Sequence, residues 1–182
     1  MRKLVVYTLL SVDGVAESPD RYFAAFDVEM HANLARVIET QDTALLGRRT
    51  YDEWANYWPT SDQQPFADFI NRVPKYVVTS TRPDVPWANT GLVDTAPAEF
   101  VRELKNRPGS DSGVHGSIQL ARSLLADGLV DELCLVIAPA LAGRGQRLFT
   151  TDQPDVSRLE LLRSRSTSSG GVLSDYRVTA DD

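Results

Sequence analysis

The feature of the sequence that most constrains the fold is an alternation of short, β-branched apolar runs with amphipathic helical stretches. The runs expected to form strands are Lys3–Leu9, Thr43–Gly47, Lys75–Thr79, Gly113–His115 and Asp131–Ala138. The stretches with apolar residues at helical spacing between them are Val28–Glu39, Arg48–Trp54, Phe66–Arg72, Pro97–Asn106 and Ser117–Ala126. Strands that alternate with helices form parallel sheets, because each helix carries the chain back to the edge where the next strand starts. The pattern predicts a mostly parallel sheet with helices on both faces.

The C-terminal part of the chain follows a different pattern. Leu159–Arg165 and Val172–Val178 are strand-like and flank a polar turn that ends in Gly170-Gly171, which is typical of a β-hairpin. We therefore expect an antiparallel pair at the C-terminal edge of the sheet. Residues 15–26 contain Pro19 and scattered aromatic side chains, and we expect them to form a loop. The chain contains no internal repeat or linker, so residues 1–182 are predicted to form one α/β domain.

The residue inventory excludes several classes of protein. With one cysteine, Cys134, and two histidines, His31 and His115, the chain cannot form a Cys/His zinc site or an internal disulfide, and we expect no metal. The apolar run Leu4–Leu10 is interrupted at Ser11–Gly14, so neither a membrane span nor a signal peptide is predicted, and we expect a cytoplasmic protein. The net charge of −6 argues against nucleic acid or an anionic membrane as partner, but not against a small anionic ligand held by local arginines.

Polar and glycine-containing turns follow three of the predicted strands. In open α/β sheets, ligands bind beyond the carboxyl ends of the strands, where backbone N–H groups and arginines can hold phosphates. The candidate residues are Gly47, Arg48, Arg49 and Thr50; Ser80, Thr81 and Arg82; and Gly116, Ser117, Ile118 and Gln119. Each group alone also fits an ordinary polar turn or helix cap with solvated arginines. Together they predict a bound dinucleotide that carries several phosphates.

Fewer residues are candidates for proton transfer. Asp13 follows the first strand and is a candidate proton donor or substrate hydrogen-bond acceptor, although an Asp-Gly turn explains it equally well. His115 is either an acid/base group or a structural residue beside the ligand, and Cys134 is expected in the core. Trp54, Tyr57 and Trp58 either line a site for a flat ring or only pack the loop that follows them.

Several motifs in order resemble a known family, the dihydrofolate-reductase-like reductase domain of bifunctional riboflavin-biosynthesis deaminase–reductases, and its stand-alone members most of all. The resemblance extends from Lys3 to Val178. The motifs that carry it are Ser11–Gly14, Leu46–Tyr51, Val77–Ser80, Val114–Ser117, Leu129–Leu133, Ala138–Gly145 and Arg147–Phe149.

This resemblance implies an NADPH-dependent reductase, usually a homodimer, that acts on a small pyrimidine-like or pterin-like heterocycle. In the family, the Gly-Arg-x-Thr segment, the Ser/Thr turn and the Gly-Ser helix start contact the cofactor, and these match the eleven candidates named above. An arginine that pairs with the 2′-phosphate would favour NADP over NAD. The resemblance places the Ser-x-Asp-Gly loop near the nicotinamide and makes Asp13 the best candidate for proton handling. The C-terminal strands and the edge of Asp131–Ala138 are candidate dimer interfaces.

The chain also departs from the family pattern. The deaminase zinc signature is absent from the sequence, and Val15–Tyr22 does not match the Ser-x-Trp-Ile stretch of the biosynthetic enzymes. His115-Gly116 replaces the Gly-Gly pair of true dihydrofolate reductases. Asp27 or Glu29 could be placed at the position of their pterin-binding carboxylate, but neither lies in a motif specific enough to assign that role. These departures leave a second hypothesis open, an NADP(H)-binding module without turnover that acts as a sensor or partner protein. A scaffold without any ligand is the third alternative.

Overall fold

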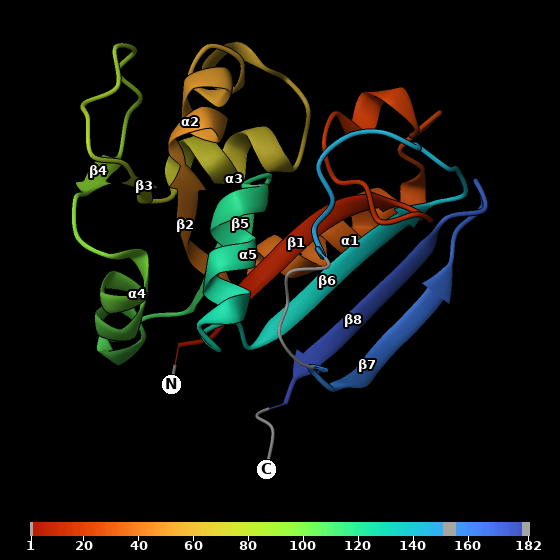
Figure 1. Ribbon diagram of the computed structural model, residues 1–182. Coiled ribbons are helices and arrows are strands. Elements are labelled where there is room, and N and C mark those ends of the chain that lie inside the picture. Colours follow the sequence, from red (N-terminus) through yellow and green to blue (C-terminus); the bar gives the residue numbers. More distant parts are fainter. Residues whose placement is uncertain (1, 151–155, 180–182) are drawn as a thin grey trace.

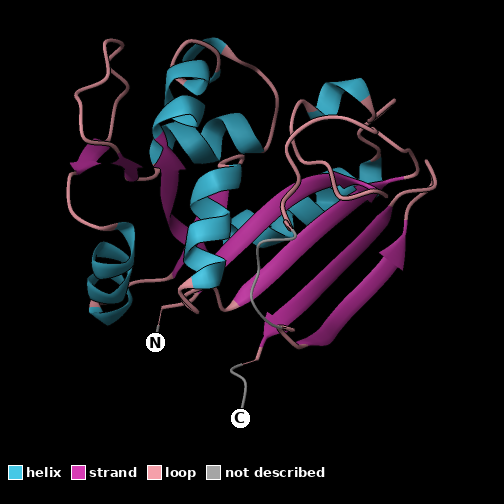
Figure 2. Cartoon of the chain, viewed as in Figure 1, coloured by secondary structure: helices cyan, strands magenta, loops and turns pink. Residues whose placement is uncertain are grey.

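The computed structural model describes residues 2–150 and 156–179, and the strands in these ranges belong to one continuous sheet (Figures 1 and 2). The strands are β1 (Leu4–Ser11), β2 (Gln41–Gly47), β3 (Lys75–Val78), β4 (Thr90–Val93), β5 (Asp111–His115), β6 (Glu132–Ala138), β7 (Leu159–Ser166) and β8 (Val172–Val178). Their order in the eight-stranded sheet is β4-β3-β2-β5-β1-β6-β8-β7. β1 to β6 run parallel to one another, whereas β8 is antiparallel to β6 and to β7.

Helices cover both faces of this sheet. They are α1 (Val28–Glu39), α2 (Arg48–Trp54), α3 (Phe66–Arg72), α4 (Pro97–Asn106) and α5 (Ile118–Ala126), with short 3₁₀ turns η1 (Pro19–Arg21) and η2 (Trp58–Thr60). α1, α2 and α3 contribute to one apolar cluster, which contains Met30, Tyr51 and Phe69. α4 and α5 contribute to a second cluster on the other face, which contains Leu104 and Leu124. The predicted α/β fold, with a mostly parallel sheet and an antiparallel C-terminal hairpin, is confirmed.

The helix predictions agree closely with the structure because the local signals are strong. α1 begins after Asp27, whose side chain accepts a hydrogen bond from the backbone N–H of Met30, as an N-cap residue does. α5 ends before Gly128, which adopts a φ of +65° that only glycine reaches without strain. The ranges predicted for α1, α2, α3 and α4 coincide with the observed bounds.

Some strand predictions needed correction. The short strand β4 was not predicted, because four residues that include Gly91 give little periodic signal. Asp131–Ala138 is not an edge, because β6 is paired with β1 on one side and with β8 on the other. The free edges of the described sheet are β4 and β7, and all eight residues of β7 are exposed. In the described part of the chain, no helix has both the length and the apolar run that a membrane span requires.

Candidate functional site

Two of the predicted ligand-binding turns are joined by hydrogen bonds at the carboxyl edge of the sheet. The backbone N–H of Gly47 donates to Oγ of Ser117 at 2.9 Å, and Oγ1 of Thr50 donates to the carbonyl of Gly116 at 3.2 Å. β2 and β5 are adjacent parallel strands, so the turns that follow them emerge side by side. The structure thus brings the Gly47–Thr50 and Gly116–Gln119 segments together, 70 residues apart in the sequence.

The N-terminus of α5 faces this junction with backbone N–H groups free of a side-chain cap. Ser117 is the N-cap residue, but its hydroxyl accepts from Gly47 and makes no cap hydrogen bond to its own helix. Gly116 is exposed, has a φ of +65°, and a Cβ there would lie 2.6 Å from Cζ2 of Trp54. Because Trp54 fills the space in which a Cβ would lie and the φ is positive, this position requires glycine.

Arg48 connects the turn that contains Ser80, Thr81 and Arg82 to the turn after β2. Its Nε donates to both carboxylate oxygens of Asp52 at 2.9 and 2.8 Å, and its Nη1 donates to the carbonyl and the hydroxyl of Thr81 at 2.9 and 2.6 Å. These contacts fix the plane of the guanidinium and leave Nη2 without a hydrogen bond to the described residues. Ser80, Thr81 and Arg82 are exposed in the same turn, directly after β3.

Arg49 lies on the other side of the Gly47–Thr50 turn. Its guanidinium contacts Glu17 and Glu53, each at 3.3 Å, and its side chain is 69% exposed. Ion pairs this exposed contribute little to stability, so the arginine can exchange partners at small cost. Sequence reasoning missed the acidic partners of both arginines. The spacing of Arg48 to Asp52 and of Arg49 to Glu53, each four residues on a helix, is the signal that would have found them.

Asp13 is held by the loop that follows β6. Its Oδ1 accepts from Oγ of Ser11 at 2.6 Å and from the N–H of Ala142 at 2.9 Å, and its Oδ2 accepts from the N–H of Gly143 at 2.9 Å. The hydrogen bonds from Ser11 and Ala142, in that order, hold the pKa of the carboxyl well below its usual range. Asp13 is thus ionised at neutral pH. It makes the contacts of a turn and loop anchor, and its role as proton donor stays a prediction.

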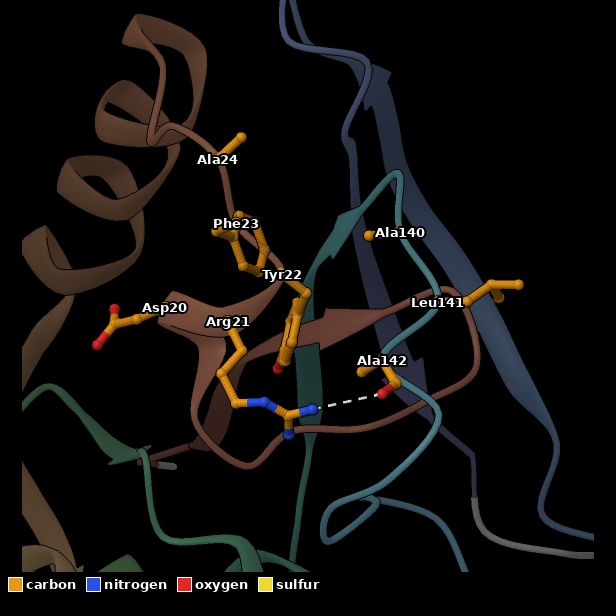
Figure 3. Close-up of a pocket in the computed structure, with 8 residues that line it drawn as sticks. All are labelled: Asp20, Arg21, Tyr22, Phe23, Ala24, Ala140, Leu141 and Ala142. Atoms are coloured by element: carbon orange, nitrogen blue, oxygen red, sulfur yellow. Dashed lines mark hydrogen bonds between the residues drawn. The ribbon is translucent and has the colours of Figure 1, made fainter.

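The same two loops are joined at further points. Glu17 accepts from the N–H of Gln146 at 3.0 Å, and Val12 donates to the carbonyl of Ala140 at 2.9 Å. Between the loops lies a cavity of about 360 Å³. Figure 3 shows its lining, in which Asp20–Ala24 face Ala140–Ala142 and the Arg21 guanidinium points to the carbonyl of Ala142. This lining includes none of the residues predicted to bind the cofactor.

His115 lies inside the core, at the end of β5. Its ring is 2% exposed, packs against Tyr7, Phe66 and Phe69, and lies 2.8 Å from Oε1 of Gln41 through Nε2. Burial lowers the pKa of the imidazole to about 3, so the ring is neutral at physiological pH. These contacts favour a structural role for His115, beside Gly116, over a role in acid/base chemistry.

The remaining candidates pack in the core or beside it. Cys134 is buried on β6, as predicted for a core residue, and burial raises the pKa of its thiol. Trp54 and Trp58 meet edge to face with ring centroids 5.7 Å apart, and both pack on Phe66. The aromatic residues therefore pack the loop after α2, while the edge of Trp54 also covers Gly116. The described residues contain no cluster of three or more His, Cys, Asp or Glu arranged to hold a metal ion.

Comparisons with known proteins agree with this architecture. The family model of the RibD C-terminal domain matches residues 2–173. An uncharacterized protein of Bacillus subtilis (strain 168), YyaP, is 26% identical over 175 residues, which cover 94% of this chain and 92% of that protein. The structure is similar to a putative riboflavin biosynthesis protein from Shewanella sp. PV-4, with a TM-score of 0.80, 17% identity and coverage of 98% and 99% of the two chains.

A bifunctional protein has the same fold in part of its chain. The diaminohydroxyphosphoribosylaminopyrimidine deaminase/5-amino-6-(5-phosphoribosylamino)uracil reductase from Thermotoga maritima matches with a TM-score of 0.71 and 11% identity. The match covers 98% of this chain and 57% of that one. At this identity the likeness concerns the fold.

Proposed function

Because the chain belongs to the RibD C-terminal domain family, we propose that it is a reductase that transfers hydride from NADPH to a small pyrimidine-like or pterin-like heterocycle. Family membership supports the coarser statement, an oxidoreductase that uses a nicotinamide cofactor. The choice of NADPH, the substrate class and the residue roles are the proposal. They rest on the site's own geometry.

The observation that carries the proposal is the junction of the three turns. Gly47 and Ser117 share a hydrogen bond, and Arg48 bonds Thr81, so the turns after β2, β3 and β5 form one continuous polar surface. A dinucleotide carries phosphates several bonds apart, and a surface that spans adjacent strand ends matches that spacing better than any single turn does. The three predicted segments therefore act as one binding site.

The residues present fit a dinucleotide phosphate. The N–H groups at the start of α5, which have no side-chain cap, suit a pyrophosphate. Arg48, oriented by Asp52 and Thr81, presents Nη2 outward, and Arg82 lies in the exposed turn after β3. Guanidinium groups in this position suit the 2′-phosphate that distinguishes NADPH from NADH.

The bound cofactor would supply the hydride, and the protein would orient the two reactants. Arg48 and the α5 N-terminus would hold the phosphate end, and Trp54 beside Gly116 would limit access of water to the backbone there. Asp13 keeps the loop Pro139–Gly145 against β1 and is our candidate for contact with the substrate. Because its carboxylate is ionised, the proton for the reduced product has a simpler source in water or in the substrate itself.

The test combines binding with turnover. NADPH binding is measured by calorimetry, and NADPH oxidation is followed with a panel of aminopyrimidine and pterin substrates. We expect micromolar or tighter binding and oxidation with at least one substrate of the panel. Failure of NADPH to bind would refute the cofactor assignment and the site together.

The second candidate function is an NADP(H)-binding module without turnover. It is favoured by one observation, that Asp13 and His115, the two candidates for proton transfer, are both engaged in internal hydrogen bonds. Binding and turnover together separate the two functions. A module without turnover binds NADPH, and its melting temperature rises when NADPH is added, but it oxidises no NADPH with any substrate of the panel.

We also propose a cytoplasmic homodimer. The interface would involve β7, whose exposed leucines Leu159, Leu161 and Leu162 lie on a free edge of the sheet. Sedimentation of the wild type beside Leu161→Glu tests this, since the variant should sediment as a monomer if β7 forms the interface.

A further inference from the structure

A cavity of about 360 Å³ lies between the segments that follow β1 and β6, and the three cofactor turns do not contribute to it. One wall is formed by Asp20–Ala24 and the other by Ala140–Ala142 (Figure 3). The larger apolar side chains of the lining are Tyr22, Phe23 and Leu141, and Leu141 is 77% exposed. A recess of this size, with apolar walls and few polar groups, is typical of a site for a small molecule.

Arg21 provides the positive charge of this cavity. Its Nη1 donates to the carbonyl of Arg144 at 3.1 Å, and its Nη2 donates to the carbonyl of Ala142 at 3.5 Å. Figure 3 shows the guanidinium directed across the cavity toward Ala142, whereas the side chain of Asp20 points away from it. The ion pairs formed within the described residues do not include Arg21. Its charge therefore meets only neutral carbonyl groups there.

Other arginines near these loops have acidic partners. Arg147 lies 3.4 Å from Oδ2 of Asp13, and Arg49 lies 3.3 Å from Oε1 of Glu17. The chain as a whole carries a net charge of −6, so carboxylates outnumber the basic groups. Against this background, an arginine that lines a cavity and is held by carbonyls alone is suited to an anion from outside the chain.

The carbonyl contacts also orient the guanidinium. Two of its five N–H donors hold the backbone, which leaves donors for a ligand, and a planar guanidinium can bind the two oxygens of a phosphate or carboxylate at once. Asp13 holds the same loop from its N–H groups, at Ala142 and Gly143. Arg21 and Asp13 thus grip adjacent residues of one loop, so a ligand held by Arg21 would lie close to Asp13.

We propose that this cavity binds a small organic anion, whose phosphate or carboxylate group pairs with Arg21 and whose uncharged part packs against Tyr22, Phe23 and Leu141. A cationic ligand would be repelled by the guanidinium, and a neutral ligand would leave its charge without a counterion. The site lies outside the cofactor turns. The step that makes this ligand the substrate, a heterocycle with an acidic group, rests on the proposed function.

The test uses three aromatic probes of similar shape and different charge, which are phenyl phosphate, benzoate and neutral benzamide. Each is titrated into the whole chain while backbone amide signals are followed by NMR. We expect at least one of the anions to shift the signals of Ala142 and Arg144, with benzamide shifting them far less. The anion that binds more tightly identifies the oxyanion that the site prefers. The signals of Gly47 and Ser117 report separately on binding at the cofactor turns.

Variants of the arginine show whether the charge is responsible. Arg21→Gln should raise the dissociation constant of the bound anion by about tenfold or more, because a charge-assisted hydrogen bond is lost. Arg102→Gln, at an exposed arginine on α4, is the matched control and should bind as the wild type does. Arg21→Lys keeps the positive charge and should retain part of the affinity, which separates loss of charge from damage to the loop.

Three results would overturn the proposal. They are benzamide binding as tightly as benzoate, anion binding that is unchanged in Arg21→Gln, and anions that shift only the signals of the cofactor turns or none at all. NADPH binding is measured on the same variants and should be unaffected by Arg21→Gln. If NADPH does not bind while an anion binds at Arg21, the proposed function fails and the anion site remains. If NADPH binds and no anion binds at Arg21, the reverse holds.

Discussion

Nε2 of His115 and Oε1 of Gln41 are 2.8 Å apart in the core, and their hydrogen bond joins the carboxyl end of β5 to the start of β2. The Gln41 side chain reaches His115 across Gly113, where a Cβ would lie 2.0 Å from Oε1 of Gln41. Because Oε1 can only accept, Nε2 donates and carries the proton of the neutral ring. This bond fixes the residue that precedes Gly116, and so supports the start of the turn that we propose to bind the cofactor.

The buried imidazole should make folding sensitive to acid. The folded pKa of His115 is lowered to about 3 from an ordinary value of 6.5, so the folded state binds fewer protons than the unfolded state between these values. Its contribution is present in full above pH 6.5 and is lost as the pH falls toward 3, at about 1.4 kcal/mol per pH unit. The free energy of unfolding is measured by chemical denaturation at a series of pH values. Its slope against pH should be smaller in His115→Phe than in the wild type. His31→Gln, at the exposed histidine, should retain it, and an unchanged slope in His115→Phe would contradict the assignment.

Gly113 should be intolerant of alanine for the same reason. The added methyl would also lie 2.5 Å from Nε2 of His115, so the hydrogen bond to Gln41 must break. We expect Gly113→Ala to lower the free energy of unfolding by about 2 kcal/mol. Gly47→Ala is the control, because its Cβ would meet only contacts of 3.8 Å or more and its φ of −75° suits alanine. Equal stability of the two variants would count against this reasoning.

Removal of Arg48 should affect NADPH more than NADH. The arginine is held in place by Asp52 and Thr81, and a hydrogen bond to a charged phosphate is worth about 1.5–3 kcal/mol. We expect Arg48→Ala to raise the dissociation constant of NADPH at least about tenfold more than that of NADH. Arg49→Ala should act in the same direction, and Arg102→Ala, an exposed arginine on α4, should leave both constants unchanged. Equal losses for both cofactors would exclude a 2′-phosphate contact.

Lys75 should make stability rise with pH in mildly basic solution. Its ammonium is buried, donates to the carbonyls of Ile70 and Val73, and lies 4.6 Å from the centre of the Trp87 ring. Burial lowers its pKa to about 8 from 10.5, so between these values the unfolded state binds more protons and the free energy of unfolding increases with pH. Denaturation between pH 8 and pH 10.5 should show this increase in the wild type and not in Lys75→Met. Lys3→Met is the control, because the pKa of Lys3 is raised by Glu132 and its contribution is lost only at higher pH.

Asp13 should hold the loop after β6 in place. Asp13→Asn loses one of the acceptors for the N–H groups of Ala142 and Gly143, so hydrogen exchange at these two amides should become faster. Asp20→Asn, at an exposed residue of the segment between β1 and α1 that also carries Asp13, should leave their exchange unchanged. If the exchange is unaltered while turnover falls about a hundredfold, Asp13 acts in proton transfer and its contacts with the loop are secondary.

The candidate site shows which features of the sequence were informative. Gly47, Ser117 and Thr81 could be selected because strand–turn–helix segments place their turns at one edge of a parallel sheet. The hydrogen bonds of Gly47 with Ser117 and of Arg48 with Thr81 could not be predicted, because they depend on β2, β3 and β5 being neighbours in space. The engagement of Asp13 by Ala142 was equally hidden, since the two residues are 129 positions apart.

The sequence by itself determined the local elements and the class of fold. Helix ends at Asp27 and Gly128 follow from cap chemistry that involves only a few neighbouring residues, and the alternation of strands with helices imposes parallel pairing. Only the tertiary structure decided that β6 lies inside the sheet, that Gln41 reaches His115 over Gly113, and that Arg36 of α1 pairs with Asp175 of β8. The physical reason is that these contacts depend on strand order and register, and a one-residue shift in register would turn every side chain of the strand to the other face.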